Sequence, residues 1–300
     1  MTTAAIGLLV LSAFVHATWN LIGKRHDPSA RFFLAANTTG VVLLSPVVAA
    51  NLNMVAKYPS KVWVILAITG LFQAIYFMGL AGAYKSGHLS VAYPLARSAP
   101  VLMVAFVSAL MGKAGQLSTF SVVGMALIAA GGLLLPIRRF SDWKLRDYLH
   151  ASTIFALMAA IGTTGYSIAD DSALRALKES VDANKVALTL SYAFFEGVST
   201  FIWLGLILLI TGRSSKEAEK PEPLRFANVA VAGFGICLAY TIVLLAMTLA
   251  KNVSYVVAFR QLSIPIGAML GVTVLREPRS MIKFAAITVM LIGLVLVAVF

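Results

Sequence analysis

The feature that most constrains this sequence is a series of long apolar stretches without Asp, Glu, Lys or Arg. Residues 4–22, 62–83 and 285–300 are examples. A run of about 20 such residues matches the hydrocarbon core of a bilayer. Only 12% of the 300 residues are charged, whereas a soluble domain has roughly 25%. The sequence therefore predicts an all-α polytopic membrane protein.

Charged residues, glycines and prolines divide the chain into ten expected transmembrane segments. They are residues 2–22, 31–50, 61–83, 87–111, 117–137, 149–169, 186–211, 226–249, 253–275 and 281–299. The stretches 138–147 and 212–225 are polar and are expected to be loops. Residues 170–185 begin with two aspartates, and we expect at most a short interfacial helix there.

The distribution of Lys and Arg predicts the orientation, because cytoplasmic loops carry an excess of both. The loops after the first, third, fifth, seventh and ninth segments hold most of them. We therefore expect those loops in the cytoplasm and both termini outside, in a multi-pass protein of the cell inner (plasma) membrane. The first segment has no basic region before its apolar core and is expected to be a retained helix.

Two parts of the chain align at an offset of about 165 residues. The matched pairs are Gly70 with Gly235, Ser98 with Ser263, and Pro100 with Pro265. Each half would hold five helices, an odd number, so the halves would insert with opposite orientation. We expect two inverted repeats, residues 1–142 and 143–300. In transporters, such repeats place the binding site near the midplane. A shared apolar composition is the alternative explanation.

The second half carries Pro265, then "LREP" (275–278) and "MLIGLVLV" (290–297), and the first segment ends in "HATWNLIGKR" (16–25). With ten helices in two halves, the chain resembles the drug/metabolite transporter superfamily of the EamA type over nearly its whole length. It departs from the pattern at Gly112, which occupies the first-half position of Glu277. The resemblance implies a central cavity lined by the first, third, fourth, sixth, eighth and ninth segments.

Two arginines lie inside apolar segments. Arg97 is about midway along its segment, where a charge costs a few kcal/mol on insertion scales. Tyr93 lies one turn before it on the same face. Arg97 could attract an anionic group of a solute, or it could be held by helix carbonyls or by an acid such as Glu196. Arg260 is shallower and could bind the solute or reach toward the interface.

The alignment places Arg97 on Leu262 and Arg260 on Leu95. An offset of two residues is about 200° around a helix. If the two segments are equivalent, at most one arginine points into the cavity. We expect that arginine to be Arg97.

Other polar residues inside the expected helices are candidates for coupling or binding. Glu196 could carry a coupling proton, bind a substrate ammonium or pair with an arginine. His16 could titrate near physiological pH or join two helices by a hydrogen bond. The remaining candidates for substrate binding are Trp19, Asn20, Gln73, Tyr76 and Tyr240. Tyrosines at membrane depth can also serve as interfacial anchors.

Several classes of protein are excluded by missing patterns. The sequence has no GxxxxGKS/T, HExxH, CxxC or GxSxG, so we expect neither an enzyme nor ATP-driven transport. We expect no metal and no cofactor. The net charge of +12 is scattered through short loops, which argues against nucleic acid. A single cysteine, Cys237, excludes an internal disulfide.

The sequence therefore predicts a secondary transporter of small polar metabolites, such as amino acids or organic anions. It would act in the lipid bilayer as a monomer or homodimer, either as an exporter or as a proton-coupled carrier. A carboxylate or phosphonate suits the planar donor fork of an arginine. The alternatives are efflux of lipophilic cations or drugs, and a non-transporting membrane scaffold.

Overall fold

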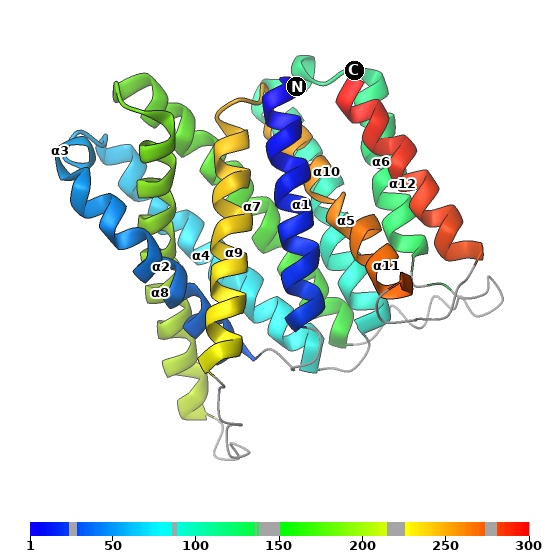
Figure 1. The fold of residues 1–300 in the computed structure, drawn as a ribbon, viewed down its shortest axis with the longest axis horizontal. Coiled ribbons are helices and arrows are strands. Elements are labelled where there is room, and N and C mark those ends of the chain that lie inside the picture. The colour runs from blue at the N-terminus through cyan, green and yellow to red at the C-terminus, as the bar shows by residue number, and fades with distance from the viewer. Residues whose placement is uncertain are drawn as a thin grey trace.

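The computed structural model describes residues 1–23, 29–85, 89–135, 137, 151–214, 226–273 and 281–299, and in these residues it holds helices and turns but no strand (Figure 1). The helices are α1 Thr3–Gly23, α2 Ala30–Ala50, α3 Leu52–Val55, α4 Ser60–Lys85, α5 Leu89–Ser108, α6 Thr119–Leu134, α7 Ala151–Ser180, α8 Lys185–Ser214, α9 Phe226–Met247, α10 Val253–Arg260, α11 Ser263–Thr273 and α12 Met281–Val299. Short π and 3-10 turns, Ala109–Lys113 and Ala114–Gln116, link α5 to α6.

The outer surface of this bundle is apolar. Eight stretches of helix in the described residues are long and apolar enough to cross a membrane, and α1 and α6 add two shorter ones. Large apolar side chains such as Val64, Phe106, Ile210 and Val295 are exposed on the surface. A soluble monomer rarely exposes so much contiguous apolar area. The prediction of an all-helical protein suited to a membrane agrees with this architecture.

The long helices run back and forth, and both termini lie at the same edge of the bundle (Figure 1). We call this edge the terminal edge. The helix pairs with the most extensive contact are α4 with α7, α6 with α12, and α1 with α9. Glycines permit the close approach of α6 and α12. A Cβ on Gly124 of α6 would lie 2.6 Å from the carbonyl oxygen of Gly293 of α12, and the reverse distance is 2.5 Å. Small residues let the backbones touch in this way.

The structure extends α7 well beyond residue 169. Asp170 and Asp171 are 0% and 2% exposed in the middle of the helix. The prediction that the sixth transmembrane segment ends near residue 169 was wrong, because α7 continues to Ser180. The physical reason is that apolar residues continue at helical spacing, with Leu174 and Leu177 buried on the same helix.

The expected helix 253–275 is interrupted. α10 ends at Arg260, a turn occupies 261–262, and α11 begins at Ser263. Pro265 has no N–H with which to bond the carbonyl of Gln261, so it removes one rung of the helical ladder. The "LREP" run at 275–278, the stretch 138–147 and most of 212–225 fall outside the described residues.

Candidate functional site

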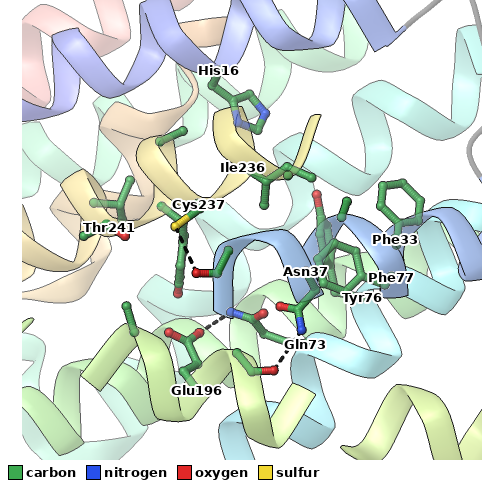
Figure 2. Close-up of a pocket in the computed structure, with 18 of the residues that line it drawn as sticks. His16, Phe33, Asn37, Gln73, Tyr76, Phe77, Glu196, Ile236, Cys237 and Thr241 are labelled. Atoms are coloured by element: carbon green, nitrogen blue, oxygen red, sulfur yellow. Dashed lines mark hydrogen bonds between the residues drawn. The ribbon is translucent and has the colours of Figure 1, made fainter. Parts of the chain in front are cut away.

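A cavity lies among α1, α2, α4, α5, α7, α8, α9 and α10 (Figure 2). The cavity has a volume of about 100 Å³. The six segments implied by the resemblance all contribute, and α2 and α8 contribute as well. Seven of the predicted site residues line it: His16, Gln73, Tyr76, Arg97, Glu196, Tyr240 and Arg260.

The three other predicted residues are placed only by their backbone. Tyr93 lies on α5, and Trp19 and Asn20 lie near the end of α1. Their side chains fall outside the described part of the structure, so their role in binding stays a prediction.

The cavity has an apolar side. Phe33 of α2 stacks on Phe77 of α4, with ring centroids 5.0 Å apart. Leu44, Leu80 and Ile236 continue this surface. Figure 2 shows Phe33, Phe77 and Ile236 near Tyr76, while Gln73 and Glu196 lie elsewhere in the cavity. The site therefore offers both an apolar surface and polar groups to one ligand, as small-molecule sites usually do.

Arg97 is held between two helices. Its Nη1 lies 2.8 Å from His16 Nε2, and its Nη2 donates to Ser263 Oγ at 2.6 Å. Because an arginine has only donors, Nε2 of His16 must accept, which requires a neutral imidazole. The Nε of Arg97 is buried, with no partner among the described residues. The interpretation that Arg97 pairs with Glu196 was wrong, because the guanidinium of Arg97 contacts His16 and Ser263 instead.

Arg260 also faces the cavity. Its Nη2 donates to Tyr166 OH at 3.2 Å, and its guanidinium lies 5.1 Å from the ring centroid of Tyr240. Cation–π contacts of this kind stabilise a desolvated arginine. Nη1 is buried and has no partner in the described part of the chain.

The expectation that at most one arginine reaches the cavity was wrong, because both Arg97 and Arg260 line it. The expectation assumed equivalent helices. The turn at 261–262 ends α10 immediately after Arg260 and removes that equivalence. The interpretation that Arg260 extends toward the interface was wrong for the same reason.

Glu196 of α8 belongs to a cluster of polar side chains that also holds Gln73 of α4 and Thr200 of α8. Gln73 Nε2 donates to Glu196 Oε1, and Thr200 Oγ1 donates to Gln73 Oε1 at 3.3 Å. Glu196 is 2% exposed. In the part of the chain that the structure describes, no Lys or Arg forms an ion pair with it.

One carboxyl of this region was missed by the reasoning from sequence. Asp170 accepts hydrogen bonds from Thr69, Tyr192 and Tyr240. The sequence did carry a signal. Buried apolar residues recur at helical spacing on both sides of Asp170, which indicates a continuous helix.

The charged groups of the site are therefore two arginines and two carboxyls inside an apolar bundle. Each arginine retains one buried nitrogen without a described partner. A buried polar group without a partner costs free energy. A ligand that supplies acceptor oxygens to these nitrogens would remove that cost.

Comparison with known proteins identifies the fold only. No protein-family model matches the chain, and no curated protein matches it. A solved structure, described only as a crystal structure of a protein, superposes with a TM-score of 0.69. The superposition covers 99% of this chain and 98% of the chain in that structure, and the two sequences are 20% identical. Likeness at that identity shows a shared fold and nothing about the ligand.

Proposed function

We propose that the protein is a secondary transporter of small polar metabolites that carry an anionic group, such as amino acids or organic anions. The observation that carries this proposal is the pair of arginines, Arg97 and Arg260, lining one cavity inside an apolar bundle. Buried charges in a membrane protein are costly, and they generally mark a pathway for a solute or ion.

The packing supports two inverted repeats of five helices. Exchanging the halves pairs α1 with α7, α4 with α9, and α5 with α10–α11. The contact of α4 with α7 then becomes that of α9 with α1. The contact of α5 with α7 becomes that of α10 and α11 with α1, while α6 with α12 maps onto itself. This internal symmetry also supports membership of the EamA-type transporters.

The cavity suggests how a solute is held. An anionic group would receive hydrogen bonds from the guanidinium groups, since arginine offers several donors in a planar fork. The apolar part of the solute would lie against Phe33 and Phe77. A zwitterion would place its ammonium group near Glu196. Transport would be facilitated or proton-coupled and would not use ATP, either as export or as uptake across the plasma membrane.

A binding screen with the purified protein tests the solute class. We expect amino acids, organic acids or phosphonates to raise the melting temperature, and quaternary ammonium compounds to have no effect. Stabilisation by quaternary ammonium compounds alone would contradict the proposal. A solute found in this way should enter sealed vesicles without ATP, and an absolute requirement for ATP would exclude a secondary transporter.

A further inference from the structure

Asp170 lies directly behind the wall of the cavity and is completely buried. Thr69 Oγ1 of α4 donates to its Oδ1 at 2.6 Å, and Tyr192 OH of α8 donates to the same oxygen at 2.7 Å. Tyr240 OH of α9 donates to Oδ2. One carboxylate on α7 therefore accepts hydrogen bonds from three other helices. An ionised carboxylate has acceptor sites for all three of these donors.

The next residue shows how a buried aspartate is ordinarily stabilised. Asp171 forms ion pairs with Lys113 at 3.1 Å and with Arg175 at 2.9 Å. Asp170 has no ion pair within the described ranges, and its direct hydrogen-bond partners are hydroxyl groups. Removing a proton from such a group, or returning it, changes the local charge without an ion-paired cation to cancel it.

Tyr240 connects Asp170 to the cavity. Its hydroxyl donates to Asp170 Oδ2 and its side chain lines the cavity, which gives a proton a path inward. Its ring faces the guanidinium of Arg260. A change at Asp170 is therefore transmitted through Tyr240 to one of the proposed solute-binding arginines.

The ionisable groups around Asp170 come from every helix that packs on this part of α7. α8 presents Tyr192 and Glu196, α9 presents Tyr240, and α10 presents Arg260, which acts on Asp170 through its charge. On other elements the ionisable groups are Tyr76 of α4, Lys113, and Arg97 of α5 with its partner His16 of α1. On α7 itself they are Tyr166, Asp171 and Arg175.

The cavity lies on one side of this cluster. Phe33 and Leu80, which line it, lie near the ends of α2 and α4 that are remote from the terminal edge. Between Asp170 and the terminal edge, α7 packs through buried apolar residues such as Leu177 and Val181. The part of α7 on the terminal side of Asp170 is therefore packed, and the cavity reaches the ends of α2 and α4 that are remote from the terminal edge.

We propose, building on the transport function above, that Asp170 is a proton-binding site that couples proton movement to the opening of the cavity. A proton from the cavity adds to the Tyr240 oxygen while the Tyr240 proton passes to Asp170 Oδ2. The new carboxyl O–H then donates to the Tyr240 oxygen, and the O–H of Tyr240 points away from Asp170. This loosens α7 from α9 and favours opening at the terminal edge. Loss of the proton to that side restores the carboxylate and the three hydrogen bonds.

Cys237, the only cysteine, lines the cavity and reports which side is open without any knowledge of the solute. In vesicles, the impermeant thiol reagent sulfonatoethyl methanethiosulfonate is applied to each face separately. The ratio of the two labelling rates cancels the effect of pH on the thiol. Between mildly alkaline and mildly acidic pH, we expect the labelling rate from the terminal face to rise about three- to tenfold relative to the rate from the opposite face. One or two neutral hydrogen bonds produce a population shift of this size.

Asp170→Asn mimics the neutral carboxyl, so its ratio should stay at the acidic value at every pH. Asp171→Asn is the matched control and should keep the wild-type response. Tyr240→Phe should weaken the response while keeping the ring beside Arg260. In infrared difference spectra, the protonated-carboxyl band that grows in acid should be reduced in Asp170→Asn and retained in Tyr240→Phe.

A wild-type pH response in Asp170→Asn, an equal loss of the response in Asp171→Asn, or an unchanged infrared band in Asp170→Asn would overturn the proposal. None of these measurements uses a solute. A protein that keeps this pH response but transports no anionic solute would therefore contradict the proposed function and leave the proton site standing.

Discussion

α5 and the α10–α11 pair occupy corresponding places in the two aligned halves, yet one is continuous and the other is broken. Pro100 and Pro265 are aligned, so each removes one backbone hydrogen bond. In the second half, Gln261 Nε2 donates to the carbonyl of Val257 at 3.0 Å, and Ser263 Oγ donates to that of Arg260 at 2.9 Å. Side chains there satisfy carbonyls at the break.

The aligned serine of the first half makes no such contact. Ser98 Oγ is buried without a hydrogen-bond partner among the described residues, whereas Ser263 Oγ bonds both to the break and to Arg97. A proline alone therefore does not break a helix in this protein. The break forms where neighbouring polar side chains stabilise it, and it brings Arg260 to the same cavity as Arg97.

The largest expected effect concerns Arg97. Arg97→Gln should weaken binding of the anionic solute about ten- to hundredfold, because hydrogen bonds to charged groups are worth about 1.5–3 kcal/mol. Arg97→Lys keeps the charge without the fork and should fall between Gln and wild type. Isothermal titration with the solute found in the screen measures both. Undiminished affinity in a folded Arg97→Gln protein would show that the arginine of the continuous helix is not part of the site.

The second prediction tests the contact of α6 with α12, to which the two halves contribute equivalent helices. Gly124→Ala or Gly293→Ala should destabilise the protein by about 1–3 kcal/mol, because each new methyl group meets the backbone of the other helix. Gly205→Ala is the matched control, since a Cβ there meets nothing within 4 Å. Thermal unfolding in detergent should show a lower melting temperature for the first two changes only. Equal effects at all three positions would count against close contact of α6 and α12.

The third prediction contrasts the two serines directly. Ser263→Ala removes two hydrogen bonds and should cost about 1–3 kcal/mol, whereas Ser98→Ala removes an unpartnered hydroxyl and should be nearly neutral. Ser263→Thr, which keeps the hydroxyl, is the control. Thermal unfolding of the three variants measures the difference. If Ser98→Ala were the more damaging change, our account of why only one helix breaks would fail.

The smallest expected effect is the coupling energy between Arg97 and Glu196, which we expect to be close to zero. Arg97 contacts His16 and Ser263, while Glu196 contacts Gln73. Arg97→Gln and Glu196→Gln should therefore change the free energy of unfolding additively, to within about 0.5 kcal/mol. A double-mutant cycle measures this. Recovery of stability in the double variant would show that the two residues form an ion pair after all.

The sequence predicted the helical class and the position of most segments, because long uncharged apolar runs are an unambiguous physical signal. Seven of the ten named site residues line one cavity for a related reason: a polar residue inside such a run must face a polar space. The role of these residues in binding remains a proposal.

What could not be predicted depended on partners distant in sequence. Asp170 looked like the start of a loop because the hydroxyls that surround it belong to α4, α8 and α9. The position of Arg260 depended on the turn at 261–262, whereas an aligned proline in the first half produced none. At Asp170 the local pattern was overruled by tertiary hydrogen bonds, whereas the turn at 261–262 is stabilised by side chains adjacent to it in the sequence.

The charge selectivity of labelling at Cys237 shows whether the cavity attracts anions. The reaction rates of Cys237 with the sulfonate reagent and with the matching trimethylammonium reagent are each divided by the rate for a free thiol in solution. We expect a higher normalised rate for the sulfonate, and loss of that preference in Arg97→Gln and in Arg260→Gln. An equal or higher normalised rate for the trimethylammonium reagent in the unaltered protein would contradict an anion site.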